Sequence, residues 1–351
     1  MRLPSGTYNV SYEKDMAIIR TRTQWSIFIL FILFLFLLPL IPGIGSRYVL
    51  GMVNMALIWV VAVLGLAILT GFCGQISLGQ AAFMACGAYT SAILMTHLNI
   101  SFWLSMPIAI LLTALIGLFF GLPALRLKGL YLLMTSLAAQ YIITYIILHI
   151  PALTHGGEGM KVPLAHLGDF AIVSATSNYY LILINAILAT FVAVNIGRSQ
   201  IGRAFVAIRD NDIAAEVMGV DITKYKLMAF AIGCGFAGWA GALSANNSQV
   251  ISVEQFTLMH SLWFIGALIV GGMGSVLGTI LGVMFIRILF EGSATLAPVM
   301  ARMLAGEASI GSIGQLVFGL AVILFLIFEP RGLNHRWQIL KAYYRLFPFS
   351  H

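Results

Sequence analysis

The sequence predicts an all-α, polytopic membrane protein. Of its 351 residues, 60% are apolar and 9% are charged, and the mean hydropathy is +0.99. Such a chain has too little polar surface to cover a water-soluble globule. Charge is missing from residues 48–125, 129–157, 170–197 and 227–253, and a spanning helix needs about 20 mainly apolar residues. Unpaired backbone is costly in lipid and the alternating strands of a membrane barrel are absent, so we expect helical spans.

We expect about ten spans, bounded where Pro, Gly or polar clusters interrupt the apolar pattern. The first is expected to remain uncleaved, because it is followed by PGIGSR rather than by a cleavage site of small residues. The expected spans cover residues 25–40, 49–69, 80–96, 102–122, 130–150, 179–196, 225–245, 258–271, 275–290 and 313–328.

The distribution of Lys and Arg predicts that both termini are cytoplasmic. In that orientation fifteen of the 19 basic residues lie inside, against Arg47, Lys161 and Arg302 outside and Arg287 near a helix end. The chain then divides into a cytoplasmic tail (1–24), a transmembrane domain (25–328) with a charged cytoplasmic loop (197–224), and a basic cytoplasmic tail (329–351). The net charge of +7 fits anchoring at an anionic lipid leaflet, not nucleic-acid binding.

The sequence lacks the motifs of several catalytic classes. There is no G-x-x-x-x-G-K-[ST] phosphate loop and no H-E-x-x-H, and the histidines are scattered. The three cysteines, Cys73, Cys86 and Cys234, lie in or beside apolar spans without a C-x-x-C or Cys/His ligand spacing. We therefore expect no enzymatic activity, no metal site, no cofactor and no disulfide.

Arg287 and Glu291 come closest to being charges within a span. Their spacing of four residues favours an ion pair near the membrane interface over a proton relay. An ion-coupled transporter would need a titratable or coordinating group at depth. Energy for any uphill transport must therefore come from a partner.

The charged loop and the two residues after it (197–226) contain nine charged residues. Phe205 and Ile208 form a short apolar face, after which Asn211 or Asp212 is a good N-cap for a second short helix at 213–218. Gly219 is a natural residue to end that helix.

Two further features of the charged loop bear on its role. Asp221 can cap the next span, and Ile213, Val217 and Met218 are available for docking. The alternative is an ordinary solvated loop with an interfacial helix.

The segment IAAEVMGVDITKYKLMAFAIGCGFAGWAGAL (213–243) resembles the cytoplasmic loop and following span of M-type permease subunits of ABC importers for branched-chain amino acids. The order Ala-Ala-Glu departs from that family's Glu-Ala-Ala-type element, whereas Gly219 is retained. Further segments resemble family signatures in the expected order across most of residues 49–333: GFCGQISLGQAAFMACGAY (71–89), RLKGLYLLMTSLA (126–138), THGGEGM (154–160), IVGGMGSVLGTILG (269–282) and FEPRGL (328–333).

The resemblance implies a non-enzymatic permease subunit in the bacterial inner membrane, embedded in lipid. Its implied partners are a second homologous permease, two cytoplasmic ATPase subunits and an external solute-binding protein, and its implied cargo is branched-chain or other neutral amino acids. It also implies that residues 209–219 form a coupling helix that docks in a cleft of an ATPase. The residues expected there are Arg209, Asp210, Asn211, Asp212, Ala214, Ala215, Glu216 and Gly219.

Three other motifs have two interpretations each. The polar and glycine residues Gly71, Gly74, Gln75, Ser77, Gly79 and Gln80 interrupt two spans, so they could line a pathway or serve close helix packing. Gly274, Gly278 and Gly282 form a small-xxx-small face that favours tight packing. The loop containing Gly156, Gly157, Glu158 and Lys161 is long enough to be a docking surface for the binding protein, with a plain solvated loop as the alternative.

Two rival functions stay open at this stage. One is the same kind of importer with urea or another small polar solute as cargo, since urea permeases resemble this chain across the same motifs. The other is a stand-alone facilitator or channel, which would work without ATPase partners.

Overall fold

A computed structural model describes residues 22–41, 45–124, 130–167, 170–171, 174–303, 310–329 and 332–346. The tail up to residue 21 and the RLK turn at 126–128, both used in the predicted orientation, lie outside these residues.

Each of the ten expected spans falls on a helix. Seven helical segments within the described residues are long and apolar enough to cross a membrane, and the expected short span at 258–271 gains length from a 3-10 turn, η4 (Val253–Phe256). The all-α polytopic class is confirmed, whereas the number of crossings stays a prediction. The ten helices are α2 (Arg22–Leu37), α3 (Arg47–Leu66), α4 (Gln80–His97), α5 (Phe102–Ala124), α6 (Leu130–His149), α8 (Ala175–Arg198), α11 (Ile222–Ser248), α12 (Leu258–Gly271), α13 (Val276–Met303) and α14 (Ile310–Phe328).

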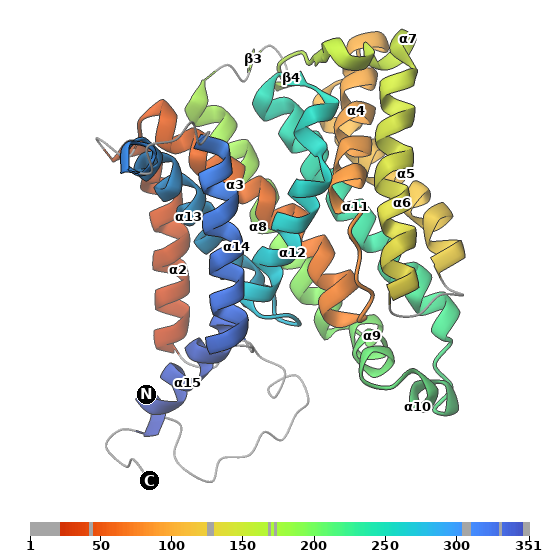
Figure 1. Cartoon of the computed structure of the whole chain (residues 1–351), viewed down its shortest axis with the longest axis vertical. Coiled ribbons are helices and arrows are strands. Elements are labelled where there is room, and N and C mark those ends of the chain that lie inside the picture. The colour runs from red at the N-terminus through yellow and green to blue at the C-terminus, as the bar shows by residue number, and fades with distance from the viewer. Residues whose placement is uncertain are drawn as a thin grey trace.

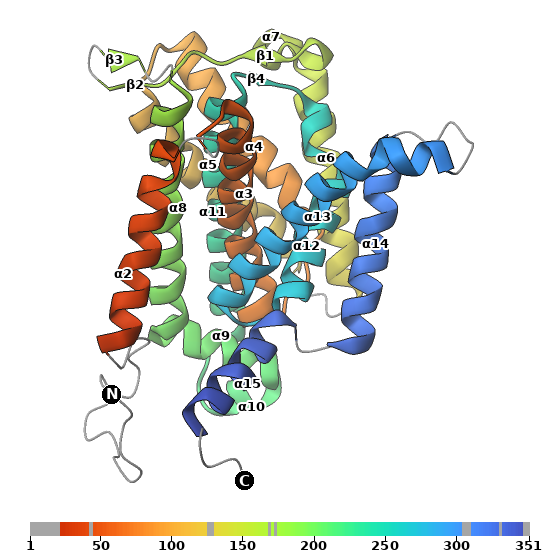
Figure 2. The ribbon, with the colours of Figure 1, turned by 90° about the vertical axis from the view of Figure 1, so that its left-hand side faces the viewer.

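Helices α3 and α11 form the centre of the bundle. In their spanning segments, 83% and 78% of the residues in the apolar window are buried. In the other five long segments, this share is between 28% and 39%. Helix α11 packs against α3, α4 and α5 (Figures 1 and 2). The outer helices therefore present apolar surface to lipid or to other subunits.

Glycines allow the backbone of α11 to lie in direct contact with the backbones of its neighbouring helices. A Cβ on Gly241 would lie 2.0 Å from the carbonyl oxygen of Met84 in α4, and one on Gly87 of α4 would lie 2.3 Å from that of Gly238. On the other side, a Cβ on Gly65 of α3 would lie 2.6 Å from the Gly233 carbonyl oxygen. Small residues are the usual means of close helix packing in membranes.

The predicted small-residue packing of α13 is also present. A Cβ on Gly278 would lie 2.6 Å from the carbonyl oxygen of Gly271, and one on Gly282 would lie 2.1 Å from that of Ala267, so both glycines pack against α12. Gly274 lies instead in the turn between the two helices, with φ +88°.

Short elements mark the two ends of the bundle. Helices α9 (Gln200–Asp210), α10 (Asp212–Val217) and α15 (Leu333–Leu346) lie at one end (Figure 2). At the opposite end lie α7 (Pro151–Thr154), the turn η3 (Gly156–Glu158) and four short strands. These strands form two antiparallel pairs, β1 (Met160–Lys161) with β4 (Val250–Ile251) and β2 (His166–Leu167) with β3 (Phe170–Ala171).

This arrangement places the charged loop and the THGGEGM segment at opposite ends, as the predicted orientation requires. The sequence patterns did not predict the strand pairs, which are too short to show an alternating pattern. Which end faces the cytoplasm stays a prediction.

We expect Gly241→Val to destabilise the bundle, because its first side-chain carbon must displace α4. Overpacking of this kind costs about 1–3 kcal/mol. The check is a lower midpoint of thermal unfolding in detergent. Gly51→Val is the matched control, since nothing lies within 4 Å of a Cβ at Gly51 of α3. Equal midpoints for the two variants would contradict the proposed packing.

Candidate functional site

The site starts from a break in the helical structure at residues 73–79. Helix α3 continues into a π-helical segment, η2 (Ala67–Phe72), then the chain loses helical structure until α4 begins at Gln80. At membrane depth, non-helical backbone is tolerated only where protein or water satisfies it.

Side chains from neighbouring helices satisfy the backbone where the break meets α4. The Ser136 hydroxyl of α6 accepts from the Leu78 N–H at 2.9 Å, and the Ser261 hydroxyl of α12 accepts from the Ala81 N–H at 2.9 Å. Gln80 and Ala81 are both 0% exposed, so α4 begins inside the bundle.

Gln140 of α6 joins the same polar layer. Its carbonyl oxygen accepts from the Ala82 N–H at 3.0 Å and from the Ser261 hydroxyl at 3.3 Å, while its Nε2 donates to the Phe256 carbonyl at 2.8 Å. Ser136, Gln140 and Ser261 were not predicted as site residues, because isolated polar residues within apolar spans give no local signal of what they contact.

The predicted pathway residues are brought together, but most of them are enclosed. Gln75, Ser77 and Gln80 are 5%, 1% and 0% exposed. Gln80 Nε2 donates to the carbonyl oxygens of Ala62 at 2.9 Å and Gly233 at 3.2 Å. The Oε1 atoms of Gln75 and Gln80 are buried and have no hydrogen-bond partner among the described residues.

The predicted caps of the charged loop are all present. The Asn211 side chain accepts from the Ala214 N–H at 3.1 Å, which selects Asn211 over Asp212 as the N-cap of α10. Gly219, with φ +87°, ends that helix: its N–H bonds to the Glu216 carbonyl at 2.9 Å, and the Val220 N–H bonds to that of Ala215 at 3.0 Å. This is the pattern of a Schellman cap.

Asp221 caps the next helix, as predicted, by accepting from the Lys224 N–H at 3.0 Å. Lys226, one turn into α11, lies 3.9 Å from the carboxylate of Asp212. Helix α10 is therefore held at both of its ends against the start of α11.

Helix α9 is anchored by the apolar face that the sequence predicted. Phe205 and Ile208 are 0% and 4% exposed, and the Phe205 ring meets Tyr225 of α11 edge-on at 6.3 Å. In contrast, Ile213, Val217 and Met218 of α10 are 68%, 82% and 83% exposed. Ala214 and Glu216 are also exposed, whereas Ala215 is buried and supports α10 from behind.

Arg209 connects the charged loop to the break. Its guanidinium donates to the carbonyl oxygen of Gly71 at 2.9 Å and binds the Asp210 carboxylate at 2.9 Å. A Cβ on Gly74 would lie 2.9 Å from Arg209 Cγ, and one on Gly274 would lie 3.0 Å from an Arg209 nitrogen. Three motifs that are remote in the sequence therefore meet at one side chain.

The residues predicted as an external docking loop lie at the opposite end of the molecule. Gly157, Glu158 and Lys161 are exposed, whereas Gly156 is buried. The Thr154 hydroxyl donates to the Ile147 carbonyl at 2.6 Å, which fixes the start of this loop on α6.

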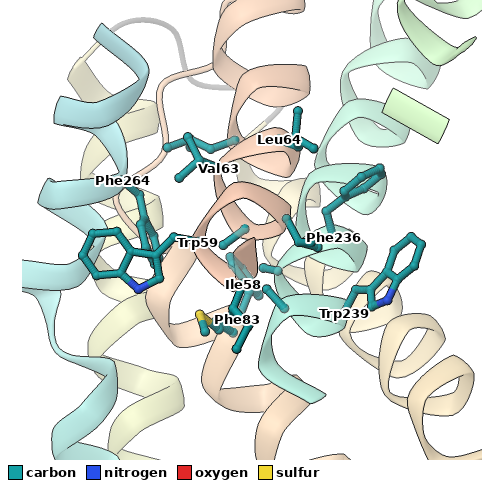
Figure 3. Close-up of a cluster of buried hydrophobic side chains, with 14 of the residues drawn as sticks. Ile58, Trp59, Val63, Leu64, Phe83, Phe236, Trp239 and Phe264 are labelled. Atoms are coloured by element: carbon teal, nitrogen blue, oxygen red, sulfur yellow. The ribbon is translucent and has the colours of Figure 1, made fainter. Parts of the chain in front are cut away.

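The prediction that Arg287 pairs with Glu291 is wrong. Among the described residues no ion pair joins the two side chains, and the Arg287 guanidinium lies over the ring of Trp59 at 5.0 Å. Trp59 projects from α3 toward α12, beside Phe264 (Figure 3). Arg287 therefore contacts an aromatic ring of another helix and forms no ion pair along α13 within the described residues.

Known proteins share much of this sequence. Residues 48–326 match the family model described as "Branched-chain amino acid transport system / permease component". The chain is 30% identical to the high-affinity branched-chain amino acid transport system permease protein LivM of Salmonella typhimurium and to that of Escherichia coli, over 83% of this chain and 71% of each relative. It is 25% identical to a probable branched-chain amino acid transport permease protein, LivH, of Methanocaldococcus jannaschii, over 58% of this chain and 66% of the relative. No solved structure matches the chain.

We expect Gln140→Leu to destabilise the buried polar layer. The substitution leaves the Ala82 N–H and the Phe256 carbonyl without their partner, and a buried unsatisfied group costs about 1–3 kcal/mol. Thermal unfolding in detergent should show a clear decrease in midpoint. Thr135→Val on the same helix is the control, since within the described part of the chain the Thr135 hydroxyl bonds only to the Tyr131 carbonyl, at an exposed position. An unchanged midpoint for Gln140→Leu would rule out a supporting role for this amide.

Proposed function

The chain belongs to the family of branched-chain amino acid transport permease components, and on that premise we propose how its parts act in transport. The chain is a multi-pass inner-membrane protein and the permease subunit of an ABC importer for branched-chain amino acids. Its relatives are transport permeases, so the chain is a transport subunit rather than an enzyme.

We propose that α10 receives the movement of an ATPase subunit. The observation that carries this proposal is its exposed apolar surface of Ile213, Val217 and Met218 on a helix with both ends capped. Adjacent exposed apolar side chains on a short capped helix are typical of a protein-binding surface, so a protein partner is the favoured cover. Glu216 adds a charge to the same helix.

Arg209 supplies the path from α10 to the break. When α9 and α10 shift together, the guanidinium moves with them and displaces the Gly71 carbonyl that it binds. Gly71 in turn lies against Gly274, since a Cβ there would be 2.8 Å from the Gly274 nitrogen. The proposed motion therefore reaches both the start of α4 and the turn between α12 and α13, which supports a gating role for the predicted pathway residues.

The proposed assembly contains a second homologous permease, two ATPase subunits and an external solute-binding protein. The LivH relative supports the second permease, because its name describes a permease of the same transport system class. The ATPases would dock at α10, and the binding protein would dock at the opposite end, where Gly157, Glu158 and Lys161 are exposed.

Uptake measurements separate this function from its rivals. In proteoliposomes that contain the full complex and binding protein, leucine uptake should require ATP and both ATPases. Uptake of urea in place of leucine would indicate the first rival. Downhill flux through the permease without ATPases would indicate a facilitator.

We expect Glu216→Arg and Gly219→Val to uncouple ATP hydrolysis from uptake while membrane insertion stays normal. The first reverses the charge at residue 216, so that the formal charge of α10 changes from −2 to 0, and the second places a branched side chain at φ +87°, which favours glycine. The measurement is the ratio of leucine transported to ATP hydrolysed, which should decrease at least about fivefold. Glu254→Arg, at the end opposite α10, is the matched control for the charge change. Wild-type ratios in both variants would contradict the coupling role of α10.

Arg209→Gln tests the connection between α10 and the break. The shorter amide cannot reach Gly71 while α9 keeps its position, so a charge-assisted hydrogen bond of about 1.5–3 kcal/mol is lost. We expect the complex to assemble and hydrolyse ATP, but to transport leucine at least about tenfold more slowly. Arg203→Gln, also on α9, is the control. Equal uptake by the two variants would contradict transmission through Arg209.

A further inference from the structure

A positive charge lies within a membrane-spanning segment, at Arg287 of Val276–Ser293. Arg287 lies about 16 Å from the start of α13 at 1.5 Å per residue, and the hydrocarbon core of a bilayer is about 30 Å thick. A charge at the centre of a spanning helix costs about 2.5–3.5 kcal/mol or more. Such a residue is kept only where the protein or a ligand compensates it.

This guanidinium lies against one ring of a group of packed aromatic side chains. It lies 5.0 Å from the Trp59 ring centroid, and Trp59 stacks with Trp263 of α12 at 5.9 Å. Trp263 lies 4.6 Å from both Phe290 and His260. We call Trp59, His260, Trp263, Arg287 and Phe290 the aromatic cluster. A cation–π contact compensates about 2 kcal/mol of the cost at a desolvated site, but it provides no hydrogen-bond acceptor.

The aromatic cluster therefore contains donors without acceptors. A guanidinium has five N–H donors, and the Arg287 Nε is buried without a hydrogen-bond partner among the described residues. The Nε1 of Trp263 is also buried and unpartnered within the described part of the chain. Glu291, one turn along α13, forms no ion pair with Arg287 there. Both donors require an acceptor that the described residues do not supply.

We propose that the aromatic cluster binds the carboxylate of the transported amino acid, with Arg287 and the Trp263 indole as its hydrogen-bond donors. This inference rests on the proposed function and adds a binding site to it. The planar guanidinium matches the two oxygens of a carboxylate, which it can bind with two parallel hydrogen bonds. The rings of Trp59 and Phe290 provide the apolar surface that a branched aliphatic side chain requires.

The position of the aromatic cluster connects binding to the break. Ser261 lies next to His260 on α12, and its hydroxyl caps the start of α4 through the Ala81 N–H. A ligand that shifts α12 therefore also shifts the polar layer at the break. No residue predicted from the sequence as part of the pathway belongs to this cluster.

The test compares three variants of the complete transporter in phosphatidylcholine proteoliposomes with saturating binding protein. Arg287→Gln removes both the charge and the planar guanidinium that can donate two parallel hydrogen bonds, whereas Arg287→Lys keeps the charge alone. Arg47→Gln, which removes a charge at the exposed start of α3, is the matched control. Loss of a charge-assisted bidentate pair predicts roughly a 10- to 100-fold decrease in leucine uptake for Arg287→Gln. We expect a smaller decrease for Arg287→Lys and no change for Arg47→Gln.

Direct titration of the complex in phosphatidylcholine nanodiscs, without binding protein, identifies the recognised group. Tryptophan fluorescence should change saturably with millimolar L-leucine and with 4-methylpentanoate, which keeps the carboxylate. It should not change with L-leucinol, which lacks the carboxylate, or with leucine in Arg287→Gln. Equal responses to leucine and leucinol would overturn the proposal. So would a response that follows added phosphatidylglycerol instead of leucine, because the acceptor would then be a lipid phosphate.

Three further outcomes keep this inference separate from the proposed function. If the wild-type complex transports leucine with ATP and Arg287→Gln does so equally well, the site is refuted and the function stands. If the wild-type complex does not transport leucine at all, the function itself fails. If Arg287→Gln no longer co-purifies with the second permease, Arg287 is a subunit contact, which also overturns the ligand role.

Discussion

The rest of the molecule depends on how the break at residues 73–79 is satisfied inside the bundle. In hydrocarbon, a free N–H or carbonyl group costs several kcal/mol, so a span can lose helical structure only where other residues replace its hydrogen bonds. Ser136, Gln140 and Ser261 do this for the start of α4. Helices α6 and α12 are consequently bound to the break by specific polar contacts and not only by apolar packing.

Close backbone packing extends this arrangement toward the end of the bundle that carries α9 and α10. Gly74 and Gly274 leave space that Arg209 occupies, Gly71 lies against Gly274, and the Arg209 guanidinium binds the Gly71 carbonyl at 2.9 Å. A larger residue at any of these positions would separate the charged loop from the break. The connection is therefore made by one long side chain between closely packed backbones, which suits transmission of a small displacement.

The sequence predicted those features that have local signals. Apolar runs located ten helices, and Asn211, Gly219 and Asp221 were recognisable as caps because capping involves residues only a few positions apart. Contacts between distant residues had no such signal: Arg209 and Gly71 are 138 residues apart, and Ala81 and Ser261 are 180 apart. The pairing of Arg287 with Glu291 failed for the same reason, since it treated α13 in isolation, whereas Trp59 comes from another helix.

The strand pair β1–β4 has a consequence for how this protein can evolve. Met160 pairs with Ile251 and Lys161 with Val250, and the Val162 N–H bonds to the Gln249 carbonyl at 2.8 Å. These bonds are made by backbone atoms, so they persist when side chains change. The outward-facing Lys161 and Val250 can therefore be replaced without opening this end of the bundle. Mutation can vary the surface at this end of the bundle while the connection between α6 and α11 is inherited unchanged.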